Sequence, residues 1–323
     1  MEYILFISSF FILFYGGDLL VKSSSLLAER FNVSTLVIGL TVVSFATSAP
    51  ELFVAMKAAS LGILNFEYND ITLGSVLGSN IANISLVLGF SSIFFRIPIS
   101  KQTIRFYYPF LLFASVLFVI LLSFNQSIDR AAGLILFSLL VFFISFLIWN
   151  SKRKNKLSDS KDVNKSVISL SPNLSSIILN LLVGIILLII GSDFLVNGVK
   201  DIAMILKINE RVISVSMVAI GTSIPELSTT LVAAFRNDTN LAVGNLIGSN
   251  IFNLLAVIGL TSIFYPIRFS SSLESLLLDS YWMLFFTILL GLFIFFSSRK
   301  VIGRFEGGVL FLIYIFFIYS LIN

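Results

Sequence analysis

SFATSAPELFVA, residues 44–55, is followed 175 positions later by AIGTSIPELSTT, residues 219–230. Both stretches read Thr-Ser, one further residue, then Pro-Glu-Leu, and both lie inside long apolar segments. A charged side chain at the centre of a membrane helix costs roughly 2.5–3.5 kcal/mol on insertion scales. The two symmetric carboxylates, Glu51 and Glu226, therefore require a compensating interaction.

The composition predicts a helical membrane protein. Of 323 residues, 57% are hydrophobic and 12% are charged, and the mean hydropathy is +1.02. Apolar runs long enough to cross a hydrocarbon core of about 30 Å recur along the whole chain. We therefore predict an all-α polytopic membrane protein whose surroundings are a lipid bilayer.

The absence of cysteine and histidine restricts the chemistry. Copper, zinc, haem iron and iron–sulfur clusters lose their favoured ligands without them, so any bound ion is expected to be held by oxygen atoms. We predict no covalent cofactor. The net charge of +4 needs no nucleic acid to explain it, because basic residues placed around a membrane account for it. No obligate protein partner is evident from the sequence.

Ten predicted transmembrane helices divide into two halves. Residues 1–150 hold the first five and residues 175–323 the second five, and a polar linker rich in Lys, Ser and Asn joins them at 151–174. The predicted spans are 2–21, 34–60, 71–95, 105–124, 129–149, 175–197, 210–235, 240–265, 277–297 and 303–322.

The distribution of basic residues predicts the orientation. With the N-terminus outside, 15 of the 21 lysines and arginines fall on the cytoplasmic side, as the positive-inside rule requires. The opening residues, MEYILFISSFF, carry no basic leader, so we interpret them as the first span rather than a signal peptide. We predict a multi-pass protein of the cytoplasmic membrane with both termini outside and the linker inside.

The two halves form an internal repeat. Besides the paired glutamates, residues 73–94 (LGSVLGSNIANISLVLGFSSIF) match residues 243–264 (VGNLIGSNIFNLLAVIGLTSIF) at 11 of 22 positions. Five spans per half is an odd number, so the second half is expected to enter the membrane with the opposite orientation. Inverted repeats of this kind are typical of secondary transporters, whose site lies near the midplane where broken helices meet.

Polar residues of the two halves form matching helical stripes. At helical spacing these are Ser44, Thr47, Ser48 and Glu51; Ser75, Ser79 and Asn83; Ala219, Thr222, Ser223 and Glu226; and Asn245, Ser249 and Asn253. Pro50 and Pro225 are expected to interrupt the backbone hydrogen bonds and to free carbonyls near Ala46 and Gly221. Such oxygens suit a hard cation, and Ca²⁺ in particular takes about six to eight of them.

The paired TS-x-PEL and GSNI-x-N segments resemble those of the calcium/cation antiporter superfamily, specifically its prokaryotic sodium/calcium exchangers. The resemblance covers nearly the whole chain. It implies that Glu51 and Glu226 are shared ligands of Ca²⁺ and Na⁺, and that the backbones of Thr47 and Thr222 complete the Ca²⁺ site. It further implies flanking Na⁺ sites and a central position, which would be formed by Ser48, Ser79, Ser223 and Ser249, by carbonyls at Ser44 and Ala219, and by Asn83 and Asn253.

The chain departs from the family in one respect. Several members carry an aspartate at one of the two central positions, where this chain has asparagine at both, Asn83 and Asn253. The formal charge of the site is then −2, which one Ca²⁺ or two Na⁺ neutralise. The resemblance implies antiport by alternating access, in which the first and sixth spans slide past the core.

Three alternatives are open at this point. The same scaffold could couple Ca²⁺ to protons or to K⁺, and a pH-driven, Na⁺-independent flux would indicate the former. A channel would carry Ca²⁺ without any counter-ion. An intramembrane phosphatase would need a base and cationic phosphate clamps, yet there is no histidine and no arginine beside Glu51 or Glu226, so we predict that the protein is not an enzyme.

Overall fold

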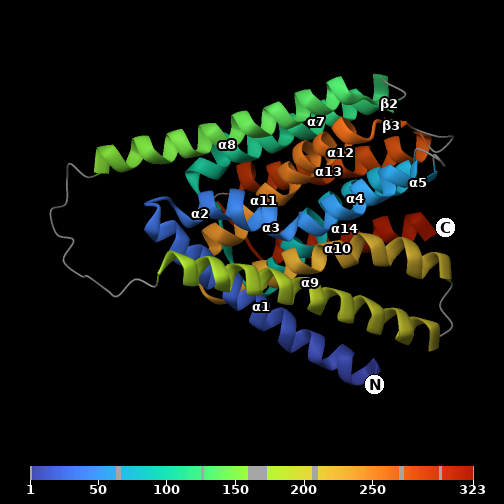
Figure 1. Ribbon diagram of the computed structural model, residues 1–323, viewed down its shortest axis with the longest axis horizontal. Coiled ribbons are helices and arrows are strands. Elements are labelled where there is room, and N and C mark those ends of the chain that lie inside the picture. The colour runs from blue at the N-terminus through green and yellow to red at the C-terminus, as the bar shows by residue number, and fades with distance from the viewer. Residues whose placement is uncertain are drawn as a thin grey trace.

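The computed structural model describes residues 2–62, 67–124, 127–158, 173–205, 210–268, 273–297 and 300–322, which are almost entirely helical (Figure 1). The first half contains α1 (Glu2–Arg30), α2 (Thr35–Ile38), the π-helix η1 (Gly39–Val43), α3 (Ser44–Thr47), α4 (Ala49–Gly62), α5 (Glu67–Ala82), the π-helix η2 (Asn83–Leu88), α6 (Gly89–Phe94), β1 (Ile97–Pro98), the π-helix η3 (Thr103–Tyr107), α7 (Tyr108–Phe124), β2 (Ser127–Ile128) and α8 (Arg130–Ser158). The second half contains α9 (Leu174–Ile205), α10 (Glu210–Phe235), α11 (Thr239–Phe252), the π-helix η4 (Asn253–Val257), α12 (Ile258–Phe264), β3 (Ile267–Arg268), α13 (Leu273–Phe296), β4 (Val301–Ile302) and α14 (Arg304–Ile322).

The helices are those of a multi-pass membrane protein. Among the described residues, eight helices are long and apolar enough to cross a membrane, and the bent pair Thr35–Thr47 and Ala49–Gly62 adds a ninth when counted as one span. α10 occupies the same residues as the predicted span 210–235. The prediction of a polytopic helical membrane fold is therefore confirmed.

Three helices continue beyond their predicted spans. α1 reaches Arg30, α8 reaches Ser158 and α9 reaches Ile205, whereas the spans were predicted to end at 21, 149 and 197. Each span was predicted to end where polar residues begin, but a helix can continue past the membrane because its backbone hydrogen bonds also form in water. The 29 residues of α1, for example, extend for about 43 Å. The start of the predicted linker is therefore helical, and its residues 159–172 lie outside the described ranges.

The second predicted span is a broken helix. After α3 the chain bends by 43° into α4, and Ser48 at the break has φ −87° and ψ 3°. Pro50 lies in the first turn of α4, where a missing N–H leaves no helical bond unmade. Glu51 consequently occupies the first turn of a new helix, whose N-terminal partial charge stabilises a carboxylate.

Pro225 does not break its helix, in contrast to Pro50. α10 runs continuously through it, so the predicted interruption of the backbone is confined to one hydrogen bond. The carbonyl of Gly221, four residues before the proline, cannot receive a helical N–H and instead accepts the Ser192 hydroxyl at 2.8 Å. The carbonyl that Pro225 frees is thus bound by α9.

Short strands connect the two halves. β1 pairs with β4 through Ile97 and Ile302, and β2 pairs with β3 through Ile128 and Ile267, both in antiparallel register. α6 packs against α14, and α8 packs against α12. Each half therefore completes the packing of the other.

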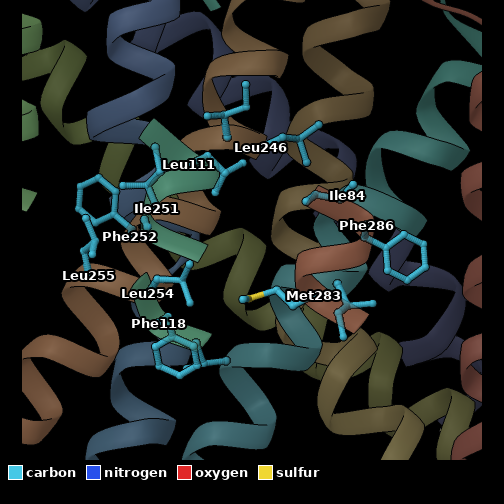
Figure 2. Packing of buried hydrophobic residues seen from close by; sticks show 14 of the residues in the cluster. Ile84, Leu111, Phe118, Leu246, Ile251, Phe252, Leu254, Leu255, Met283 and Phe286 are labelled. Carbon is cyan, nitrogen blue, oxygen red and sulfur yellow. The ribbon is translucent and has the colours of Figure 1, made fainter. Parts of the chain in front are cut away.

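The two segments that contain the GSNI motif lie at the centre of the fold. In the most apolar stretch of Ile71–Phe94, 78% of residues are buried, and in that of Thr239–Phe264 the share is 89%, against 22% for α14. Figure 2 shows Phe118, Met283 and Phe286 among the hydrophobic side chains that surround this centre. Large apolar side chains of the outer helices, such as Phe142, are exposed where a bilayer would contact them.

α1 and α9 form a separate pair at one side of the bundle, where they pack along each other (Figure 1). A Cβ on Gly16 would lie only 2.9 Å from the Cβ of Leu187, so the absence of a side chain permits the close approach. α1 is also held to the end of α10, because Asp18 pairs with Arg236, the residue that follows α10. Lys22, one turn further along α1, pairs with the same carboxylate at 2.7 Å.

Candidate cation-binding site

Two acidic side chains from the two halves share one enclosed region. Glu51 on α4 and Glu226 on α10 are both 0% exposed, and they are close enough to repel each other electrostatically. Among the described residues, no third acidic side chain joins them in a potential metal cluster. The site thus contains two carboxylates, the number expected from the sequence.

Glu51 is surrounded by hydroxyl groups from both halves. Ser79 on α5 donates a hydrogen bond to Glu51 Oε1 at 3.0 Å, and the hydroxyls of Ser79 and Ser223 lie 3.2 Å apart. The side chain of Thr222 also interacts with Glu51. Asn253 donates to the Ser79 hydroxyl at 3.2 Å, which connects η4 to the same cluster.

Glu226 has the equivalent surroundings. Ser48 donates to Glu226 Oε1 at 3.5 Å, and the side chains of Thr47 and Ser249 interact with the same carboxylate. The hydroxyls of Thr47 and Ser249 lie 3.2 Å apart. Thr47 also contacts Asn245 Oδ1 at 3.1 Å.

Ser44 joins the second and eighth predicted spans rather than lining open space. Its hydroxyl donates to the carbonyls of Gly39 at 2.6 Å and Asn245 at 3.0 Å. Its carbonyl, a predicted ligand, already accepts the Ser48 N–H at 2.9 Å. The Thr47 hydroxyl is a second, longer donor to the same carbonyl at 3.5 Å, and a cation at this oxygen would replace that contact.

Asn83 and Asn253 each begin a π-helix, η2 and η4 respectively. Such wide turns occur frequently at functional sites. Both side chains are fully buried, and each amide nitrogen has a partner: Asn83 Nδ2 donates to Asn250 Oδ1, and Asn253 Nδ2 donates to Asn80 Oδ1, both at 3.0 Å. Sequence reasoning did not single out Asn80 and Asn250.

The atoms that lack a hydrogen-bond partner indicate what the site can bind. Within the described part of the chain, Glu51 Oε2, Glu226 Oε2, Asn83 Oδ1 and Asn253 Oδ1 are buried without any donor. All four are acceptors, and a buried acceptor without a donor costs about 1–3 kcal/mol. A hard cation with oxygen preference satisfies such atoms. Asn245, whose Oδ1 contacts Thr47, contributes a buried donor without a partner among the described residues, Nδ2, beside the four acceptors.

The remaining predicted residues differ in how they relate to this cluster of unpartnered oxygens. Thr222 borders a cavity of about 360 Å³ between α4, α9 and α10, which Pro50 and Asp193 also line. Ala219 lies on α10, one turn before Ser223. Ser75 is buried but donates to the carbonyl of Thr72 at 3.0 Å, so the structure gives it a helical back-bond instead of a contact with the carboxylates.

Comparisons with known proteins agree with this geometry. The family model described as sodium/calcium exchanger protein matches residues 1–149 and 176–323. The chain belongs to the sodium/calcium exchanger family. Members of this family are membrane transporters and not enzymes, so the prediction that the protein is not an enzyme is confirmed.

Relatives of this exchanger family cover nearly the full chain. Sodium/calcium exchanger MaX1 of Methanosarcina acetivorans is 31% identical over 94% of this chain and 93% of its own length. Putative antiporter CaxA of Alkalimonas amylolytica is 33% identical over 97% of this chain and 96% of its own. The family resemblance read from the sequence is therefore confirmed.

Solved structures of an exchanger show the same membrane fold. The sodium-calcium exchanger NCX_Mj soaked with 10 mM Na⁺ and zero Ca²⁺ superimposes with a TM-score of 0.78 at 30% identity, covering 99% of this chain and 98% of that one. The same exchanger soaked with 2.5 mM Na⁺ and 0.1 mM Ca²⁺ gives a TM-score of 0.77 with the same identity and coverage. The chain is accordingly a cation antiporter of the calcium-transporting type.

Proposed function

We propose that this antiporter exchanges Ca²⁺ for Na⁺ at one shared site between Glu51 and Glu226. The observation that carries the proposal is the set of four buried acceptor oxygens without donors, two from the carboxylates and two from Asn83 and Asn253. A fully buried pair of carboxylates is tolerable in a membrane when a cation accompanies it. Both ions take oxygen ligands, and the relative MaX1 and the structural neighbour NCX_Mj are named as sodium/calcium exchangers.

Competition for the same carboxylates would make the exchange obligatory. One Ca²⁺ or two Na⁺ neutralise a site with formal charge −2, so the two kinds of cargo exclude each other. Without cargo the two carboxylates would be enclosed as bare charges, which opposes closure of the empty carrier. Each crossing would therefore carry either Ca²⁺ or Na⁺.

The ligand assignment follows the two hydroxyl clusters. Glu51 and Glu226 with the backbones of Thr47 and Thr222 would hold Ca²⁺. The hydroxyls of Ser48, Ser79, Ser223 and Ser249, with the carbonyls of Ser44 and Ala219, would line flanking Na⁺ positions, and Asn83 and Asn253 would lie at the centre. The contacts of Ser79 with Glu51 and of Ser48 with Glu226 support this division.

The predicted architecture extends this proposal to the whole chain. We propose ten spans in two inverted halves, residues 1–150 and 175–323, joined by a cytoplasmic linker at 151–174, with both termini outside the cytoplasmic membrane. Reciprocal contacts support the inverted repeat: Asn83 bonds Asn250 at the same 3.0 Å at which Asn253 bonds Asn80.

An asymmetry between α1 and α9 supports alternating access. Gly17 on α1 lies against α10 so closely that a Cβ there would be 3.2 Å from Val232 Cγ2. The equivalent residue of α9, Ser192, instead borders the cavity of about 360 Å³ that reaches Thr222. We propose that this cavity is the access path on the outer side, and that sliding of α1 and α9 closes it while opening its counterpart.

Proteoliposomes test the proposal directly. Vesicles containing the purified protein are loaded with Na⁺, K⁺ or choline at pH 7, or with choline at acidic pH, and uptake of ⁴⁵Ca²⁺ is measured. Uptake that requires internal Na⁺ is the expected result. Uptake driven by K⁺ or by the pH gradient would replace Na⁺ with the alternative counter-ion, and uptake without any counter-ion would make the protein a channel.

A further inference from the structure

Two asparagines outside the predicted stripes form a reciprocal pair across the two halves. Asn80 Nδ2 donates to the backbone carbonyl of Asn250 at 3.3 Å, and Asn250 Nδ2 donates to the carbonyl of Asn80 at 3.4 Å. Both side chains are about 1% exposed. These contacts join α5 to α11 at the centre of the fold.

The backbone carbonyls fix which way each amide points. A carbonyl can only accept a hydrogen bond, so the atom of Asn250 that faces Asn80 O must be the nitrogen. Asn250 Oδ1 must then face the other way, toward Asn83. The same reasoning fixes Asn80 Oδ1 toward Asn253.

The orientation of the Asn250 amide determines that of the Asn83 amide. Because Asn250 presents an oxygen, Asn83 must present its nitrogen, and their bond is 3.0 Å long. Asn83 Oδ1 is then left as an acceptor without a donor, and Asn253 Oδ1 is left in the same way by Asn80. Rotating the side-chain amide of Asn83 or Asn253, the two central amides, by 180° would place N–H groups where the site otherwise offers oxygen.

We propose that Asn80 and Asn250 are positioning residues that hold the oxygens of Asn253 and Asn83 available to the cation. They touch no carboxylate in the described contacts and act only through the central amides. The inference rests on the proposed function, because it assumes that the oxygens serve a transported cation. An asparagine amide can offer either a donor or an acceptor, so a site that uses asparagine instead of aspartate needs such a device to remain selective for cations.

Equilibrium binding of ⁴⁵Ca²⁺ to the full-length protein in detergent tests the proposal. Asn250→Leu removes the acceptor for Asn83 Nδ2 and releases the central amide. Partners of metal ligands typically change metal affinity about 10- to 100-fold, so we expect the half-saturating Ca²⁺ concentration to rise at least about tenfold. Asn250→Leu also removes the bond from Asn250 Nδ2 to Asn80 O, so Tyr108→Phe serves as a control for the loss of a buried hydrogen bond: it removes the bond from the tyrosine hydroxyl to Thr287 O at 3.0 Å, which involves none of the four asparagines.

A double-mutant cycle separates positioning from general stability. If Asn250 acts through Asn83, then Asn250→Leu added to Asn83→Ala changes the half-saturating concentration by less than about twofold, because coupled residues are not additive. Equal multiplicative effects in both backgrounds would overturn the proposal. So would an Asn250→Leu protein that binds Ca²⁺ within about twofold of the wild type at matched stability.

A second variant keeps the test decisive if Asn250→Leu does not fold. Asn80→Leu makes the equivalent change in the symmetric pair, because it removes the acceptor for Asn253 Nδ2. It is combined with Asn253→Ala in the same way, and the same outcomes support or overturn the proposal. The proposed function fails separately: wild-type protein that binds no Ca²⁺ would overturn both ideas, whereas wild-type binding with insensitive asparagine variants overturns the positioning role alone.

Discussion

Glu51→Gln should remove Ca²⁺ exchange while leaving the fold intact. The amide oxygen of the new side chain can still accept the Ser79 hydroxyl, which donates to Glu51 Oε1 at 3.0 Å. The amide nitrogen then takes the place of Oε2, the oxygen that has no donor among the described residues. One ligand becomes a donor, and the formal charge of the site falls from −2 to −1.

The change in charge determines how strongly Ca²⁺ binding is weakened. A site of −1 that holds Ca²⁺ keeps a net charge of +1 inside the membrane, and one such charge costs roughly 2.5–3.5 kcal/mol. At about 1.4 kcal/mol per factor of ten, Ca²⁺ binding in the enclosed state weakens about 60- to 300-fold. One Na⁺ neutralises the altered site, so Na⁺–Na⁺ exchange should persist.

The assay is ⁴⁵Ca²⁺ uptake into Na⁺-loaded proteoliposomes, with ²²Na⁺ exchange measured in parallel. Glu274→Gln is the control, because it removes an exposed carboxylate from the first turn of α13. A Glu51→Gln protein that transports Ca²⁺ at more than about a tenth of the wild-type rate would refute the reasoning. Ca²⁺ binding in the enclosed state would then not depend on the second carboxylate charge.

Three further predictions, which involve four substitutions, follow from the packing and charges of the protein. Gly248→Ala places a Cβ 2.8 Å from the backbone of a crossing helix and should lower the unfolding free energy by about 1–3 kcal/mol. The Cβ of Gly74→Ala meets nothing within 4 Å, so this change should raise the unfolding free energy by up to about 1 kcal/mol. Thermal unfolding compares the two variants, and equal shifts in melting temperature would contradict the packing. Asp18→Asn loses the ion pair with Arg236 and should lower unfolding free energy by about 1.5–3 kcal/mol, which an unchanged melting temperature would disprove. Asn253→Asp raises the site charge to −3, so Ca²⁺ uptake should become sensitive to a valinomycin-clamped potential to which the wild type is indifferent; an identical voltage response in both would exclude the charge argument.

Much of this arrangement could be predicted from hydrophobic periodicity and from the repeat. The repeated glutamates and hydroxyls lie at helical spacing, and symmetry between the halves indicates that Glu51 and Glu226 meet. That reasoning needs only which face a residue occupies, because two-fold packing brings equivalent faces together. The structure accordingly brings Ser79 to Glu51 and Ser48 to Glu226.

The details that escaped prediction depend on backbone irregularity. The π-helices that begin at Asn83 and Asn253 have no recognised sequence signature, yet they change which residues share a face with the turn before them. Asn80 lies one position off the predicted stripe and acquires its role only through the close approach of α11. Pro50 and Pro225 look equivalent in sequence, but only the first lies at the start of a helix.

The strand pairs of the two halves have a consequence for biosynthesis. β1 at Ile97 pairs with Ile302, and β2 at Ile128 pairs with Ile267, so each strand is synthesised well over 100 residues before its partner. The segment that contains Glu51, Asn80 and Asn83 is therefore made long before Asn250 and β4, which contact it or the strand that follows it. Assembly of the native protein is expected to be a late event that requires the whole polypeptide, and co-expression of the two halves as separate chains should yield function only when both are present in the same membrane.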